Sequence, residues 1–305
     1  MTTRALLFAA LGLALAIAAT ACAGQAPDGG ADGDTLELET PELEVAAGAD
    51  ITYCTYVDTE VAEDRDILAF EGVQSQFGHH TILYGARSAQ PPGTHVCTEA
   101  DMINVRYLAA GGSETGPYLV PDGIAFRLRA GQQLMIQSHF INVSNRDTTA
   151  SSRFTVDTAP PDPSRQPADL FTVVTTSIDV PAHGAGQASA ECPVGHDLSL
   201  IALGGHAHEW GSRVSIGRTT AASSASEMLY DQPWTAERMF NPVIEHYQVD
   251  QPLQLAAGDR LRVDCEYMND TDDPLAFPTE MCVAFGFYFP ADREIDCVDG
   301  HWPGG

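Results

Sequence analysis

Two histidines one residue apart are the first candidates for chemistry in this chain. His206 and His208 lie in the segment GGHAHEWGSRV, directly after a strongly apolar run. Successive side chains of a β-strand point to opposite faces, so both imidazoles of a strand H-x-H point the same way. This arrangement can offer two nitrogens to one metal ion, whereas an isolated H-x-H is more often a pair of surface histidines.

Three further segments carry possible metal ligands. His79 and His80 are adjacent in FGHHTILYGA, where both could reach one ion only through a β-bulge or through the nearer ring nitrogens. His139 lies in the middle of the apolar strand IQSHFIN and, taken alone, is more often a histidine that is hydrogen-bonded in place. Met281, in TEMCVAFGFYFP, would alone be a core side chain, but as a ligand its soft thioether selects Cu(I). A methionine beside two histidines therefore indicates copper.

The elements that must position these residues are expected to be strands. Helical periodicity is scarce, whereas strand-like alternation and Gly, Pro and Asp turns recur. The segment QLMIQSHFINV is expected to place Met135, Gln137, His139, Ile141 and Val143 on one face. The proline-rich stretch 158–169 is interpreted as a linker between domains at 46–158 and 168–300. The sequence therefore predicts an all-β chain of two antiparallel β-sandwich domains.

The N-terminal segment predicts export. Arg4 is followed by an apolar run and then by small residues, so residues 1–22 are expected to be a signal peptide. The ending ATAC resembles a bacterial lipobox, in which Cys22 is lipidated and anchors the protein in the cell envelope. The alternative is ordinary cleavage that leaves a secreted or periplasmic soluble protein. Residues 23–45 lack aromatic side chains and are rich in Gly, Asp and Glu, so a disordered acidic linker is expected there.

Charge limits the partners, and cysteine usage indicates the compartment. The 305 residues include 42 acidic and 15 basic side chains, a net charge of −27. Such a surface repels nucleic acid and anionic lipid headgroups. We expect a monomer that takes a small-molecule substrate and meets a membrane only through its lipid anchor. The six cysteines after position 22 predict three disulfides in an exported chain, with 15 possible pairings.

The order of these motifs along the chain resembles a known family. H-H, a strand histidine, H-x-H and then M-C occur in the same order in the copper type II, ascorbate-dependent monooxygenases, which include peptidylglycine α-hydroxylating and dopamine β-monooxygenases. The resemblance covers about residues 50–297 and rests on HHTILYGA, LVPDGIAFRL, GGHAHEWGSRV with Gly211, and TEMCVAFGFYF. It implies two jelly-roll-like β-sandwich domains with a cleft between them, and one copper in each domain.

The resemblance also implies roles for individual residues. The first copper, which passes electrons, would be held by His79, His80 and His139. The second copper, which binds O₂ and hydroxylates a substrate C–H bond, would be held by His206, His208 and Met281. Ascorbate or another one-electron reductant would supply electrons. The resemblance pairs Cys265 with Cys282 and Cys192 with Cys297. This leaves Cys54 for Cys97, a pairing that departs from the family, whose first domain carries more disulfides.

The chain departs from the peptide-hydroxylating members of the family at three substrate-contacting positions. Where they have Arg, Asn and Tyr, this chain has Gly204, Val283 and Phe285. A carboxylate clamp cannot be built from these side chains, so the resemblance implies a neutral or aromatic substrate. Arg213 could restore a positive charge, although its strand position favours a place on the surface. No role is assigned to the histidines at positions 95, 183, 196, 246 and 301.

The sequence thus predicts a copper-dependent monooxygenase that hydroxylates an organic C–H bond with O₂ and an external reductant. The alternative is a non-catalytic extracytoplasmic copper-binding or electron-transfer protein that has kept the sites without turnover. A third interpretation is an adhesion-like pair of sandwiches with fortuitous histidines, which the complete set of ligand positions disfavours.

Overall fold

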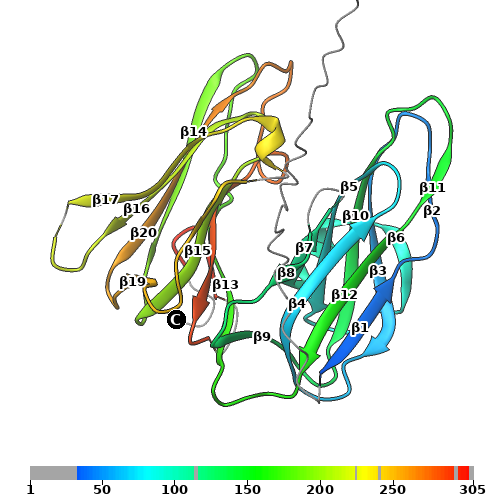
Figure 1. The fold of residues 1–305 in the computed structure, drawn as a ribbon. Helices are drawn as coiled ribbons and strands as arrows, with labels where there is room; N and C mark the ends of the chain where they lie inside the picture. Colours follow the sequence, from blue (N-terminus) through cyan, green and yellow to red (C-terminus); the bar gives the residue numbers. More distant parts are fainter. Residues whose placement is uncertain (1–32, 113–115, 224, 240–241, 292–294, 302–305) are drawn as a thin grey trace, which may run out of the picture. The chain divides into compact units, whose positions relative to one another are not determined.

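The computed structural model describes residues 33–301, except 113–115, 224, 240–241 and 292–294 (Figure 1). Residues 1–32 lie outside the described part, and so do the signal peptide and the lipidated Cys22 expected there. Among the helices that the structure describes, none has the length and apolar character needed to cross a membrane. Almost all of the regular structure is β, which confirms the predicted all-β, jelly-roll-like fold.

The first sandwich is built from two sheets. One sheet has the order β1-β12-β4-β9, with β8 beside β4, and the other has the order β6-β3-β10-β5-β7. The short strands β2 and β11 form a separate ribbon. The elements are β1 (Asp34–Glu39), β2 (Leu43–Val45), β3 (Asp50–Glu60), β4 (Arg65–Gln74), β5 (Gly78–Ala86), β6 (Gly93–Val96), α1 (Glu99–Ile103), β7 (Val105–Gly111), β8 (Tyr118–Leu119), β9 (Ile124–Leu128), β10 (Gln133–Ile141), β11 (Thr148–Ala150) and β12 (Ser152–Ala159).

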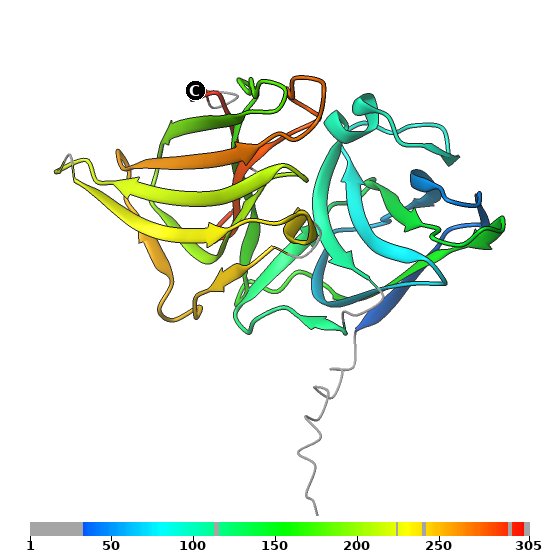
Figure 2. The same cartoon turned by 90° about the horizontal axis from the view of Figure 1, so that it is seen from above.

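The second sandwich also has two sheets. One has the order β13-β21-β15-β18, with β22 and β19 at its sides, and the other has the order β14-β20-β16-β17. The second of these sheets runs from green to orange in Figure 1 and, turned, in Figure 2. The elements are β13 (Gln166–Thr175), β14 (Ala185–Pro193), β15 (Leu198–His206), β16 (Gly211–Thr219), β17 (Ser226–Pro233), η1 (Ala236–Met239), β18 (Ile244–His246), β19 (Leu253–Leu255), β20 (Arg260–Met268), β21 (Cys282–Phe289) and β22 (Ile295–Val298).

The side chains of β10 point alternately to the two faces of its sheet. Leu134 and Ile136 belong to the core between the two sheets of the first sandwich, whereas Met135 belongs to a smaller cluster on the other face. Because strand side chains alternate, His139 lies on the same face as Met135 and Gln137, as the sequence predicted. The core of the sandwich therefore holds β10 in place while His139 remains outside that core.

The structure corrects the prediction that residues 23–45 are disordered. Residues 34–39 form β1, which pairs antiparallel with β12, and residues 43–45 form β2. Within DTLELE the alternate residues Leu36 and Leu38 turn toward the core, and Leu38 is buried. The acidic composition concealed a period-two pattern that marks a half-buried strand. The remaining residues of this expected linker, 23–32, lie outside the described part of the chain.

The connection between the two sandwiches is shorter than the linker at 158–169 that the sequence indicated. Strand β12 ends at Ala159 and β13 begins at Gln166. The first residues of β13 pair parallel with β9, so one sheet continues from the first sandwich into the second. Arg106 holds both carboxylate oxygens of Asp169 in this region, at 3.1 and 2.8 Å. The side chains of this bidentate pair are largely buried, so it is a directional link between the two halves.

Candidate metal centres

A β-bulge brings the adjacent histidines of the first sandwich together. His80 on β5 is opposite His139 on β10, and the next pair along is Gly78 with Phe140, so His79 is the extra residue of the bulge. A bulge re-aims side chains that a regular strand would send to opposite faces. The Nδ1 atoms of His79 and His80 consequently lie 3.4 Å apart. Both a bulge and an approach of the nearer ring nitrogens are therefore present.

The three imidazoles form one compact cluster. One ring nitrogen from each of His79, His80 and His139 lies within 4.8 Å of the other two. Two nitrogens that bind one ion at about 2 Å lie at most about 4 Å apart, so the spacing of the three rings is close to what a shared ion needs. Among the described residues, this is the group of His, Cys, Asp and Glu side chains whose geometry suits a metal ion.

The surroundings of the cluster keep nitrogen lone pairs available. Burial lowers the pKa of His80 to about 3, and the neighbouring His139 and His79 lower it further. Burial likewise lowers the pKa of His79. Neutral imidazole is the metal-binding form. Nε2 of His139 lies 2.6 Å from a carboxylate oxygen of Asp50, at the start of β3. An imidazole that donates from Nε2 presents Nδ1 as its lone-pair nitrogen.

The second candidate site lies where β15 meets β21. The ladder pairs Gly204 with Phe285 and His206 with Val283. The ladder ends at this pair, and His208 and Met281, the residue that directly precedes β21, lie just beyond it. The rings of His206 and His208 have their centroids 5.2 Å apart. Earlier in the same ladder the register shifts between Leu200 and Ala202, which leaves Ile201 as the extra residue of a bulge.

Hydrogen bonds join the two segments beyond the end of the ladder. Nδ1 of His208 lies 2.9 Å from the carbonyl oxygen of Thr279. Because a carbonyl oxygen can only accept a hydrogen bond, Nδ1 is the donor. This bond leaves Nε2 of His208 as the nitrogen with a lone pair. The Trp234 indole donates to the His208 carbonyl at 3.1 Å, and its ring meets that of His206 edge-on at 6.1 Å. The Tyr267 hydroxyl donates to the Met281 carbonyl at 2.8 Å.

Electrostatics at this second site also favour neutral imidazole. Burial lowers the pKa of His206 to about 3, with further lowering from His208 and then from His80 of the first cluster. The carboxyl group of Glu280, which accepts the backbone N–H of His208, has a pKa that is raised by burial. His206 thus remains an uncharged nitrogen donor throughout the neutral range.

The C-terminal part of this chain resembles a domain of a known family. Residues 169–301 match the model of the copper type II ascorbate-dependent monooxygenase C-terminal domain. This part of the chain is similar to that domain. The matched span contains His206, His208 and Met281, whereas the cluster of His79, His80 and His139 precedes it.

Comparisons with whole proteins add little to this assignment. No curated protein matches the chain. Among solved structures, the major capsid protein P2 of bacteriophage PM2 is 9% identical, with 84% of this chain and 97% of that chain covered and a TM-score of 0.39. The structure of Sulfolobus Turreted Icosahedral Virus is 7% identical, with 85% and 56% covered and a TM-score of 0.25. Likenesses this slight carry no argument about function.

Three disulfides brace the chain, and they are the three expected pairs. Cys265–Cys282 joins β20 to the first residue of β21, directly after Met281. The other two are Cys192–Cys297 and Cys54–Cys97. Disulfides persist in oxidising compartments, so three of them indicate an extracytoplasmic protein.

The face of the second sandwich next to His206 is apolar. Gly204 and His206 lie two residues apart on β15, and their cross-strand partners Phe285 and Val283 point to the same side. A Cβ atom on Gly204 would come within 2.7 Å of Ile244 Cδ1 and 2.9 Å of Phe285 Cζ. The space in which a longer side chain would begin is thus filled by two apolar groups.

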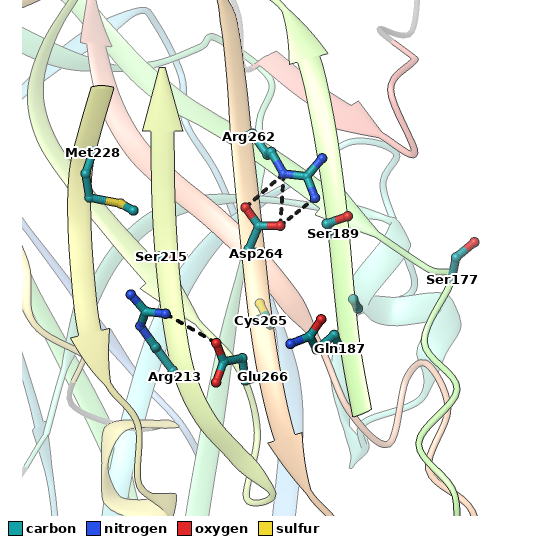
Figure 3. Close-up of a pocket in the computed structure, with 11 residues that line it drawn as sticks. Ser177, Gln187, Ser189, Arg213, Ser215, Met228, Arg262, Asp264, Cys265 and Glu266 are labelled. Atoms are coloured by element: carbon teal, nitrogen blue, oxygen red, sulfur yellow. Dashed lines mark hydrogen bonds and ion pairs between the residues drawn. The ribbon is translucent and has the colours of Figure 1, made fainter. Parts of the chain in front are cut away.

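Arg213 lies on the other sheet of this domain, on β16 (Figure 3). Its guanidinium binds both carboxylate oxygens of Asp231 at 2.7 and 2.8 Å, and it also contacts Glu266 at 3.2 Å. Arg262 and Asp264 form a similar pair on the same face (Figure 3). Arg213 therefore has the strand-surface position that its sequence context favoured, and two carboxylates already balance its charge.

Several residues of the two sites carried no recognisable signal in the sequence. Asp50 lies 89 residues from His139, so only tertiary structure shows that they meet. Tyr267 on β20 and Trp234, directly after β17, likewise reach the second site from other parts of the chain. Glu280 had the one available signal, since it stands next to Met281 in the E-M-C segment.

Proposed function

We propose that this protein is a copper-dependent monooxygenase that hydroxylates an organic C–H bond with O₂ and with ascorbate or another one-electron reductant. The family of the C-terminal domain supports copper and ascorbate dependence. The observation that carries the proposal is the cluster of His79, His80 and His139, because it supplies a second set of metal donors outside the matched domain.

The side chains present suit copper at both sites. His79, His80 and His139 would hold one ion, and His206, His208 and Met281 would hold the other, giving two per chain. Neutral imidazoles bind both oxidation states of copper, and a thioether favours Cu(I) over zinc. Bound copper supplies the electron transfer and O₂ activation on which hydroxylation depends. The chain contributes donors that stay unprotonated at neutral pH and contacts, such as Asp50 with His139, that fix their ring orientation.

The apolar face beside His206 supports a neutral substrate. Val283, Phe285 and Ile244 offer no hydrogen-bond donor, and no side chain projects from Gly204. Binding an anionic group there would leave a carboxylate desolvated and without a partner. An aromatic or aliphatic group would instead gain about 25 cal/mol for each Å² of apolar surface removed from water.

The proposal is tested with copper-loaded protein. Oxygen uptake with ascorbate is measured for phenylethylamines, acylglycines and simple aromatics, together with the hydroxylated product. The His139→Ala variant should keep one copper and lose coupled turnover. The matched control is His183→Ala, because His183 pairs with Asp272 on the surface. Tight zinc binding without copper binding would refute the assignment, and two bound coppers without product would favour an electron-transfer protein.

We also propose that the protein is exported and held in the cell envelope by a lipid on Cys22. The disulfides support export but do not bear on the anchor. The mass of the mature N-terminal peptide from the native host distinguishes a diacylated Cys22 from an unmodified N-terminus.

A further inference from the structure

A single buried carboxylate connects the two segments of the second site. The side chain of Glu280 has no exposed surface. One carboxylate oxygen accepts the backbone N–H of His208 at 3.0 Å and that of Met281 at 3.3 Å. The other oxygen accepts the backbone N–H of Trp210 at 2.9 Å. All three donors are main-chain groups of the segments that carry, or directly follow, the candidate ligands.

These segments need such a connection because the ladder ends before it reaches them. Regular pairing of β15 with β21 stops at His206 and Val283. Ala207 and His208 have left the strand, and Met281 has not yet entered one. Beyond the ladder, the bonds of Glu280 and the bond from His208 Nδ1 to Thr279 join the segment of His208 directly to the segment of Met281. Residues 279–281 thus determine both where His208 lies and which of its nitrogens is available.

We propose that Glu280 is a positioning residue of the second copper site, which holds His208 and Met281 in register for one metal ion. The inference rests on the proposed function, since it assumes that these side chains are ligands. Glu280 itself is not a ligand in this proposal, because its two oxygens are turned to backbone N–H groups.

The chemistry of the carboxylate identifies the informative substitution. Glutamine has nearly the same shape, but one of its terminal atoms is an NH₂ donor. In Glu280→Gln that donor must face either the N–H of Trp210 or the two N–H groups of His208 and Met281. At least one buried N–H then loses its acceptor, which displaces a ligand segment. Glu280→Asp keeps two acceptor oxygens on a shorter side chain and should be less severe.

Asp259 provides a matched control in the same domain. It is buried, and its carboxylate accepts backbone N–H groups of Ala221 at 3.2 Å and Ala256 at 3.0 Å. It therefore ties two turns together much as Glu280 ties two segments, but it contacts neither candidate ligand segment. Asp259→Asn therefore shows how far the loss of a buried carboxylate elsewhere in the domain lowers copper affinity.

The experiment measures Cu(I) binding by competition with a chromophoric chelator in the His139→Ala background, where the second site alone is expected to fill. X-ray absorption spectroscopy of the bound copper then shows whether sulfur is one of its ligands. Loss of an outer contact of this kind typically lowers metal affinity 10- to 100-fold. We expect that loss and a weakened sulfur signal in Glu280→Gln, a smaller loss in Glu280→Asp, and unchanged binding in Asp259→Asn.

The outcomes separate this inference from the proposed function. Absence of copper or of a sulfur ligand when Glu280 is intact would overturn the proposed site itself. If the parent protein binds copper through sulfur, an unchanged affinity and sulfur signal in Glu280→Gln would overturn the role of Glu280. Equal losses in Glu280→Gln and Asp259→Asn would do the same, because they would reflect general destabilisation. If Glu280→Gln does not fold, Glu280→Asp decides the question by the same two measurements.

Discussion

The metal-free protein should lose stability in mild acid because two of its candidate ligands are half-buried, neutral imidazoles. The pKa values of His80 and His206 are lowered by burial to about 3, whereas an imidazole in the unfolded chain has a pKa of about 6.5. Between these values the unfolded chain binds a proton at each position and the folded chain does not. The free energy of unfolding therefore falls as the pH drops below about 6.5. Above that pH, protonation of these two histidines in the unfolded chain no longer lowers the stability of the folded state.

The expected magnitude is large enough to measure. At about pH 4.5 each histidine lies roughly 2 pH units below its unfolded pKa, which corresponds to about 2.7 kcal/mol. Together His80 and His206 would remove at most about 5 kcal/mol. Domains of this kind are stable by about 5–15 kcal/mol, so the loss is a substantial fraction of the total.

The assay is urea unfolding of copper-free protein near neutral pH and at about pH 4.5. Carboxylates also titrate in this range, so the informative quantity is the difference between the wild type and the double variant His80→Asn, His206→Asn. The variant should show a distinctly shallower pH dependence, and the surface control His183→Asn should behave as the wild type. The reasoning is refuted if the wild type and the double variant lose the same free energy between the two pH values.

Three further outcomes are expected. Met281→Leu conserves volume and should cost less than about 1.5 kcal/mol of stability, yet hydroxylation should fall by orders of magnitude; near wild-type turnover of the folded variant would remove Met281 from the site. Replacing Cys265 and Cys282 by Ala should cost about 3 kcal/mol in the chain-entropy model for their separation of 17 residues, and mapping of unreduced peptides should recover the pair rather than free thiols. Leu38→Ala, on β1, should cost about 2–3 kcal/mol in urea unfolding, whereas no change would mean that this strand does not contribute to the core.

The sequence predicted the strands and the candidate ligands, because alternation and residue type are local properties. The face of β10 that carries His139 followed from period two alone. The same rule applied to DTLELE would have found β1, but the acidic composition outweighed the alternation of Leu36 with Leu38. The resulting prediction of disorder was wrong for residues 34–45.

The geometry of the two centres could not be derived from local patterns. The meeting of His79 with His80 depends on a bulge that forms only when β5 pairs with β10. The contact of Asp50 with His139 and those of Glu280 with the H-x-H segment join residues that are 89 and about 70 positions apart. Contacts at such separations depend on topology, which a single sequence does not encode in any short motif.

The bulge at Ile201 has a consequence for how this domain can diverge. Before it, Leu200 pairs with Tyr288, and after it, Ala202 pairs with Phe287, so the bulge takes up one residue of offset. Deleting Ile201 would leave the pairs on both sides intact. A one-residue deletion between Ala202 and His206 would instead send His206 to the opposite face of the sheet. In sequences that descend from this chain, single-residue deletions should therefore be found at the bulge. They should be absent from the five positions that follow it.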